Sequence, residues 1–151
     1  MKRDTAASPG PSHPLSVLER FFAAEVAYMV AGGVGNASFE GMAACLDPEV
    51  ELHQAEGLPY RGTWRGHLGM ERFFAAFTET WQSFEILRQD FLVDGDRVVV
   101  DNRIRARARA TGKELEFPIL QIVTMKGDRI VEVRPFYWDT AAIAEACSPP
   151  R

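Results

Sequence analysis

The chain has 151 residues, of which 46% are hydrophobic and 25% charged, and its formal net charge is −4. This length suits one globular domain whose core needs neither metal nor disulfide support. The acidic balance excludes a general attraction to nucleic acid or anionic membranes, and no apolar run reaches the length of a transmembrane helix.

Residues 1–14 contain several Pro, Gly and Ser residues and no apolar segment, so we expect a disordered leader and not a signal peptide. Residues 15–151 would then form a single domain. The two cysteines, Cys45 and Cys147, lie far apart and have neither a C-x-x-C spacing nor a nearby histidine pair. This pattern predicts no disulfide framework and no metal site, and it favours the reducing cytoplasm as the compartment.

The first predicted element is a helix. Ser16, followed by Glu19 three residues later, is typical of a capped helix start, and Val17 and Phe21 begin its apolar face. Glycines within residues 32–35 end it. The elements expected next are a helix over 38–46, a strand over 50–53, a loop over 57–62 and a helix over 67–80.

Long strands and glycine turns fill the second half of the chain. The strands are expected over 84–93, 97–110, 115–125 and 129–138, before a short helix over 140–147. Alternation in the second of these strands places Arg103, Arg105, Arg107 and Arg109 on one face. The other face is apolar apart from Asn102, whose amide we expect to point into the interior. Helices first and a long meander last predict an α+β fold: a strongly curved antiparallel or mixed sheet wrapped around N-terminal helices, with an internal apolar pocket.

The strand over 117–124 is apolar on both faces. Antiparallel sheets often leave one face in water, so a strand buried on both sides needs a second cover. We therefore expect a homodimer formed through the outer face of the sheet. The arginine row is expected to pair with Asp and Glu across the sheet or at that interface.

With these elements placed, the chain resembles an NTF2-like domain of the SnoaL-like and ketosteroid-isomerase-like group over residues 15–147. The resemblance rests on element order and on three segments: LDPEVELH at 46–53, YRGTWRG at 60–66 and VRPFYWD at 133–139. It implies a cone-shaped sheet that is packed at one end and binds a small hydrophobic ligand at the other. This fold hosts several chemistries, so the resemblance specifies fold better than activity.

The resemblance also implies site residues. A proton-shuttling base after the first short strand falls on His53, and the donor on the first helix corresponds to Tyr28. Glu56 either orients His53 or is itself the base, although taken alone it is an exposed loop glutamate, as His53 taken alone is a strand-end histidine. A second donor position falls on Leu120, which cannot donate a hydrogen bond. The other residues expected to contact substrate, together with Leu120, are Asn102, Trp64, Tyr60, Phe77, Phe136 and Trp138.

The function favoured by these residues is proton abstraction without metal or organic cofactor, because histidine can take and return a proton near neutral pH. The substrate would be a hydrophobic carbonyl compound, such as a polyketide or steroid-like ring, undergoing isomerisation, cyclisation or dehydration. Leu120 favours the alternative of a non-catalytic ligand-binding or dimeric interaction module. A lesser alternative is an epoxide hydrolase-like site, for which Asp101, Arg103 and Asp139 are the candidates.

Overall fold

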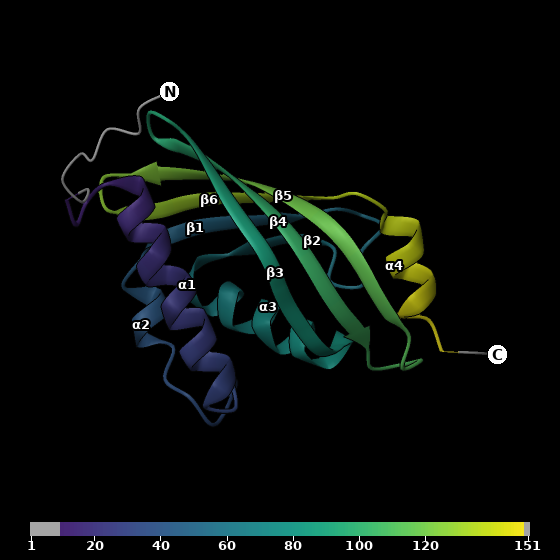
Figure 1. Ribbon diagram of the computed structural model, residues 1–151. Coiled ribbons are helices and arrows are strands. Elements are labelled where there is room, and N and C mark those ends of the chain that lie inside the picture. Colours follow the sequence, from purple (N-terminus) through teal and green to yellow (C-terminus); the bar gives the residue numbers. More distant parts are fainter. Residues whose placement is uncertain (1–9, 150–151) are drawn as a thin grey trace.

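The computed structural model describes residues 10–149. Its helices are α1 (Pro14–Val30), α2 (Glu40–Ala43), α3 (Gly66–Thr80) and α4 (Thr140–Ala146). Its strands are β1 (Leu46–Gln54), β2 (Gly62–Arg65), β3 (Trp81–Asp94), β4 (Arg97–Ala108), β5 (Glu114–Lys126) and β6 (Arg129–Tyr137). Figure 1 shows α1, α2 and α3 together on one side of the sheet, with α4 at its far end.

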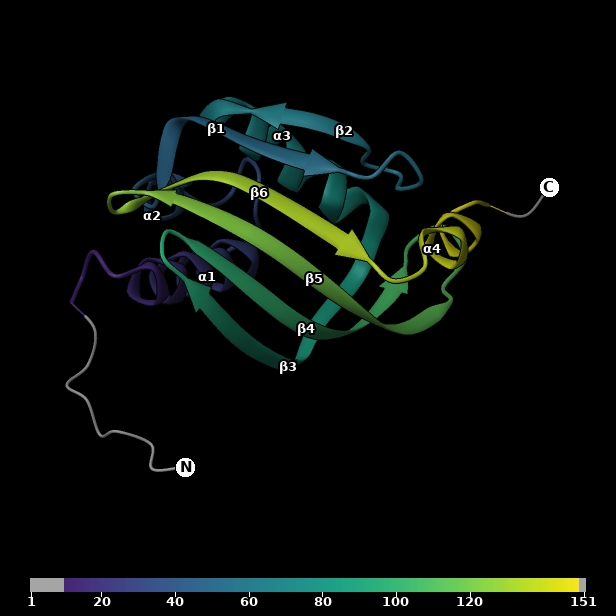
Figure 2. The ribbon, with the colours of Figure 1, turned by 90° about the horizontal axis from the view of Figure 1, so that it is seen from above.

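The six strands form one sheet in the order β2-β1-β6-β5-β4-β3. Only the β1–β6 pairing is parallel, so the sheet is mixed. The pairing of β3 with β4 shifts register after Trp81 and again after Ile86, and such bulges bend a strand. The resulting sheet is strongly curved (Figure 2), with its concave side toward α1 and α3. The predicted α+β fold is confirmed.

The core lies between this concave side and the helices. Alternate residues of β4, including Val98, Val100 and Ile104, face inward and are at most 1% exposed. From the other side, α1 contributes Val17 and Leu18, which are equally buried. Each helix buries one stripe of side chains against the sheet and leaves its opposite face in solvent, as expected of an amphipathic helix.

The start of α1 differs from the prediction. The helix begins at Pro14, and the cap is His13, whose Nδ1 accepts a hydrogen bond from the Leu15 amide at 3.1 Å, so the prediction of a Ser16 cap is wrong. Proline suits the first position because its fixed φ is helical and no amide hydrogen is needed there. The predicted leader falls mostly on residues 1–9, which lie outside the described residues.

The segment between α1 and α3 also differs. The predicted helix over 38–46 is only four residues long, and β1 begins at Leu46, earlier than expected. Strand β2 was not predicted, because Gly62 in the sequence indicates the end of a loop. In the structure this glycine has a φ of +102°, which is typical of a turn. Antiparallel pairing with β1, which aligns Trp64 with Leu52, makes this short segment a strand. Helix α3, the four long strands and α4 follow the predictions closely.

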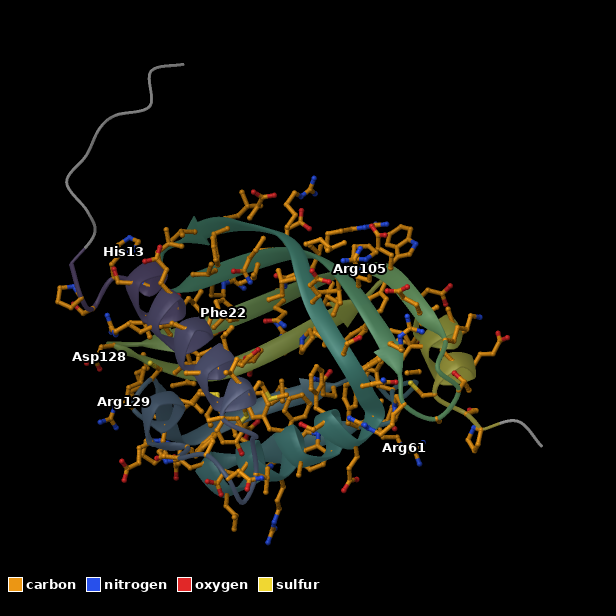
Figure 3. The ribbon with its side chains drawn as sticks, turned by 60° about the horizontal axis from the view of Figure 1, so that its bottom comes forward. His13, Phe22, Arg61, Arg105, Asp128 and Arg129 are labelled. Atoms are coloured by element: carbon orange, nitrogen blue, oxygen red, sulfur yellow. The ribbon has the colours of Figure 1, made fainter. Side chains whose placement is uncertain are left out.

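The outer face of the sheet carries charged pairs and an apolar patch. Arg103 lies 3.1 Å from Glu116 and Arg105 lies 2.8 Å from Glu85, which confirms that the arginine row pairs across the strands (Arg105 is labelled in Figure 3). Three large apolar side chains on this side are exposed: Leu120 by 43%, Phe136 by 52% and Trp138 by 83%. These three residues, which were expected to contact substrate, lie on the face opposite the concave side and do not line the cavity between sheet and helices.

The homodimer stays a prediction, and this patch gives it a test. A two-fold axis brings the same patch of two copies together, and mixed rows of Arg and Glu around an apolar centre suit such self-pairing. We expect wild-type protein to be a dimer by size-exclusion chromatography with light scattering, and Phe136→Glu to be a monomer. Val34→Glu, at an apolar side chain 51% exposed outside the patch, should stay dimeric. A monomeric wild type, or a dimeric Phe136→Glu, would contradict the prediction.

Candidate functional site

A cavity of about 90 Å³ lies between the concave side of the sheet and helices α1 and α3. Its walls are mainly apolar and aromatic. Phe22 extends from α1 (Figure 3), Phe73 and Phe77 come from α3, and Ile104 and Ile119 come from the sheet. A concave apolar space with a few polar groups is the usual form of a small-molecule site.

The polar residues that line this cavity come from both layers. They are Glu25, Gln54, Gln89, Asn102, Gln121 and Tyr137. Asn102 is 4% exposed, which confirms the predicted inward amide, and its Oδ1 accepts a hydrogen bond from Gln89 Nε2 at 2.9 Å. The strand residues among them reach the cavity because they share the inward parity of their apolar neighbours.

Glu25 lies where the cavity meets a neighbouring groove between α1 and β3, and it lines both spaces. It is placed there because it follows Phe21 and Phe22 by about one helical turn and shares their face. Part of the side chain is exposed, but the carboxyl is surrounded by protein, and this burial raises the pKa of Glu25 to about 7. No hydrogen bond or ion pair to Glu25 is formed within residues 10–149.

A pKa of about 7 means that Glu25 is present in both protonation states near neutral pH. Such a carboxyl can accept a proton and return it at the same pH, which is the property a general acid–base needs. The raised pKa of Glu25 also lowers the stability of the folded chain at neutral pH and above. Because the folded pKa lies above the ordinary value of 4.5, the folded chain binds more protons between these values, and stability falls as pH rises through this window.

This cost is measurable in Glu25→Gln. The amide does not titrate, so we expect the variant to be more stable than wild type at about pH 8, by about 3 kcal/mol, and equal to it at about pH 4, below both pKa values. Thermal unfolding followed by circular dichroism at both pH values tests this. Equal midpoints at the higher pH would mean that the Glu25 carboxyl is hydrated as an ordinary surface group.

Three hydrogen-bonding side chains form a relay that ends at the cavity. Trp81 Nε1 donates to the Tyr60 hydroxyl at 3.1 Å, and the hydroxyls of Tyr60 and Tyr137 lie 2.6 Å apart. Tyr60 is 2% exposed and packs against Phe73 and Phe77, so its hydroxyl hydrogen has no acceptor except Tyr137. Tyr60 therefore donates to Tyr137, and the Tyr137 hydrogen is left to donate into the cavity that its side chain lines.

The electrostatics keep this donor protonated. Burial raises the pKa of Tyr137 well above its ordinary value, and the nearby Tyr60 hydroxyl and Glu25 charge act in the same direction. Burial likewise raises the pKa of Tyr60 to about 12. Glu25 and Tyr137 both line the cavity. The cavity thus combines a carboxyl that titrates near pH 7 with a hydroxyl that stays a donor.

His53 does not face this cavity, and its predicted orientation is wrong. On β1 the inward residues are Leu52 and Gln54, so His53 between them points outward. Its Nε2 lies 3.2 Å from a Glu51 carboxylate oxygen, and its Nδ1 lies 3.1 Å from the Thr63 hydroxyl. These partners place His53 in a half-exposed polar cluster on the outer side of the sheet.

The other two predicted catalytic residues also lie outside the cavity lining. Tyr28 is 5% exposed, and its ring packs edge-on against Phe39 and Phe74, at centroid distances of 5.8 and 6.0 Å. Burial raises the pKa of Tyr28, with a smaller contribution from Glu71. Glu56 is exposed in the loop after β1. The structure therefore does not bring His53, Tyr28 and Glu56 together around one ligand.

The remaining predicted residues divide between the wall and its support. Phe77 lines the cavity, as expected. Tyr60 lies behind the wall as the middle of the relay, and Trp64 packs against Phe73 while its Nε1 donates to the Tyr60 carbonyl at 3.1 Å. Neither is part of the cavity lining.

The epoxide hydrolase-like alternative gains no support. Asp101 pairs with Leu120 on the outward parity of the sheet, and Asp139 caps α4 by accepting a hydrogen bond from the Ala142 amide at 3.0 Å. Neither carboxylate lines the cavity. Within residues 10–149, no three His, Cys, Asp or Glu side chains form a group that could hold a metal ion. None of the helices there is long and apolar enough to cross a membrane.

The sequence analysis missed Glu25, Gln54 and Gln121. A signal for each was present. Glu25 is an acidic residue within the apolar face of α1, and Gln54 continues the alternation of Val50 and Leu52 on β1. In the same way, Gln121 continues the inward row of β5. A polar residue at a position of inward parity is the pattern that marks this site.

Comparisons with known proteins support the fold. A model of the SnoaL-like domain family matches residues 18–133. An NTF2-like protein from Burkholderia xenovorans LB400 has a TM-score of 0.78 and 21% identity, over 89% of this chain and 95% of that one. TerC, co-crystallized with polyporic acid, has a TM-score of 0.74 and 21% identity, over 89% and 97%.

A proposed SnoaL-like polyketide cyclase from Jannaschia sp. CCS1 has a TM-score of 0.66 and 16% identity, over 96% of this chain and 100% of that one. At these identities the likenesses show the fold alone, and that fold is NTF2-like. None of the curated proteins compared matches the chain.

Proposed function

This chain belongs to the SnoaL-like domain family, and from that premise we propose that its cavity catalyses proton transfer at the α-carbon of a small hydrophobic carbonyl compound. The observation that carries the proposal is the pairing of two groups on one apolar cavity. Glu25 has a pKa of about 7, and Tyr137 keeps its proton and can donate it as a hydrogen bond.

In the proposed step, the carbonyl oxygen of the substrate accepts a hydrogen bond from Tyr137. The Glu25 carboxylate removes a proton from the adjacent carbon, so that a C–H bond breaks, an O–H bond forms on Glu25, and the electron pair moves onto the carbonyl oxygen. Tyr137 stabilises the negative charge that develops there. Protonated Glu25 then returns the proton at another carbon of the conjugated enolate, or gives it to a β-hydroxyl group that the enolate expels as water. Alternatively, the enolate carbon bonds to a second carbonyl carbon, and the oxygen of that carbonyl takes the proton from Glu25. These three fates give isomerisation, dehydration and cyclisation.

The size of the site limits how the substrate enters. A cavity of about 90 Å³ is smaller than the engineered apolar cavity of ~150 Å³ that admits benzene, so a polycyclic compound cannot lie wholly inside it. The groove on the other side of Glu25 measures about 710 Å³ and shares Phe77, Phe84 and Ile86 with the cavity. We propose that the reacting end occupies the cavity while the rest of a larger substrate lies in the groove.

Deuterium exchange tests the proposal without knowledge of the natural substrate. The probe is 4-hydroxyacetophenone, whose methyl protons are α to a carbonyl. Incubated in D₂O with the protein, it should lose its methyl signal in the proton NMR spectrum faster than in buffer alone. Exchange no faster than in the buffer blank, at a probe concentration shown to saturate binding, would overturn the proposed activity.

The second candidate function is a non-catalytic ligand-binding module of the same fold. The small volume of the cavity and its mutually bonded Gln89 and Asn102 amides favour a site made for binding. The same experiment separates the two functions: a binder holds the probe without accelerating exchange. The homodimer and the cytoplasmic location stay predictions for either function.

A further inference from the structure

Gln54, a residue of the cavity wall, carries a buried polar atom that has no hydrogen-bond partner. Gln54 is the last residue of β1, is 7% exposed and lines the cavity. Within residues 10–149 its Oε1 is the buried side-chain oxygen or nitrogen without a hydrogen-bond partner. A buried acceptor in this state costs free energy, because it has given up its hydrogen bonds to water and gained none in return. The cost is recovered when a ligand supplies a hydrogen.

The surroundings of Gln54 favour an organic ligand over a fixed water. The parallel register that pairs Leu52 with Val133 brings Gln54 level with Pro135, which has no amide hydrogen to offer. Leu52, Val133 and Pro135 all line the cavity and present apolar surface to it. A buried water needs two to four polar partners, and the residues next to Gln54 on this wall, Leu52, Val133 and Pro135, offer it no polar side chain. A hydroxyl attached to an apolar body needs only the one acceptor.

A second amide lies on the opposite side of Pro135. Gln121 on β5 is the direct partner of Pro135 on β6 and also lines the cavity. Strands are spaced by about 4.8 Å, so the backbones of Gln54 and Gln121 lie about 10 Å apart with Pro135 between them. The Gln121 side chain makes no hydrogen bond within residues 10–149. Two free amides therefore flank a flat apolar floor.

Tyr137 completes the arrangement. It follows Pro135 by two residues on β6, so its side chain has the same inward parity one position further along the strand. Its hydroxyl is a donor, whereas Gln54 Oε1 is an acceptor. A ligand that rests on Pro135 thus meets an acceptor on one side and a donor at one end. This chemistry differs from that of a simple ketone, which offers oxygen lone pairs and no hydrogen.

We propose that the cavity takes a carbonyl compound that also carries a phenolic or enolic hydroxyl group, and that this hydroxyl donates its hydrogen to Gln54 Oε1. The carbonyl accepts from Tyr137, the adjoining part of the compound rests on Pro135, and the part that the cavity cannot hold extends past Glu25 into the groove. This inference rests on the proposed function, which supplies the carbonyl, and adds the hydroxyl as the feature by which substrates are selected.

Matched ketones test the selection. Binding of 4-hydroxyacetophenone and acetophenone is measured by calorimetric titration at about pH 6, where a phenol is neutral. Acetophenone is the more hydrophobic of the two, so burial alone favours it. We expect wild type to bind the hydroxylated compound roughly three- to tenfold more tightly, the worth of one neutral hydrogen bond. Gln54→Met, which keeps the bulk and removes the acceptor, should lose this preference.

Lys113→Met is the control, because Lys113 is an exposed side chain outside the lining of both the cavity and the groove, and its loss should leave the preference intact. Equal affinities in wild type would overturn the inference, and so would a preference that survives in Gln54→Met or a failure of both ketones to bind. The binding preference and the deuterium exchange of the wild-type protein, measured together, separate this inference from the proposed function. Preference without deuterium exchange in wild type defeats the function alone, whereas exchange without preference defeats this inference alone.

Discussion

Replacing Glu25 with Gln is expected to slow deuterium exchange of 4-hydroxyacetophenone by roughly 10²- to 10⁴-fold, the usual contribution of a positioned general base. The amide keeps the size and polarity of the side chain but cannot accept the α-proton. Because the carboxylate is the active form, the wild-type rate should rise with pH and level off above about 7. NMR-monitored exchange across this pH range measures both effects.

The matched control for this prediction is His53→Gln. His53 is the base that the family resemblance indicates, and the structure places it on the outer side of the sheet beside Glu51. We expect this variant to exchange the probe at the wild-type rate with the same pH dependence. A loss of exchange in His53→Gln together with an active Glu25→Gln would reverse the assignment and imply that β1 turns its other face to the ligand.

The fold was largely predictable because its signals are local and repeated. Alternation over the four long strands and glycine turns between them predict the meander, and the inward parity of Asn102 on β4 follows from the same pattern. The parts that failed depend on contacts distant in the sequence. Strand β2 exists because it pairs with β1, and the capping of α1 by His13 needs a side chain that is uncommon at this position.

The site was predicted less well, and β1 shows why. Val50 and Leu52 are the buried residues of this strand, so alternation alone places Gln54 inward and His53 outward. Matching the strands to those of the family placed the base at His53, against the parity of its own strand. Tyr28 failed in a related way: it is buried, as expected, but it packs behind Phe74 and not beside the ligand space.

The relay could not be predicted from sequence at all. Trp81, Tyr60 and Tyr137 come from β3, the loop between β1 and β2, and β6, and only the closure of the curved sheet brings them together. Each residue taken singly reads as core. Their hydrogen-bonding atoms are satisfied by one another, which is why three polar groups can be buried among phenylalanine rings without a net penalty.

Tyr137→Phe is expected to reduce the exchange rate of the probe by roughly 10²- to 10³-fold, the loss that follows removal of one oxyanion donor. Binding should fall by much less, since a neutral ketone gains little from this hydrogen bond before charge develops on its oxygen. The variant should also be destabilised by about 1–3 kcal/mol, because the buried Tyr60 hydroxyl loses its acceptor. Exchange kinetics, calorimetric titration and thermal unfolding measure the three effects separately.

Tyr28→Phe is the matched control, since it removes a hydroxyl from a tyrosine that is 5% exposed and lies outside the cavity lining. We expect its exchange rate to equal that of wild type. Equal losses in both variants would show that the effect arises from general loosening of the aromatic core. A loss of exchange rate in Tyr137→Phe alone, with probe binding preserved, would show that the developing negative charge lies next to the Tyr137 hydroxyl. A positioned donor stabilises the charged oxygen of the transition state much more than the neutral oxygen of the bound ketone.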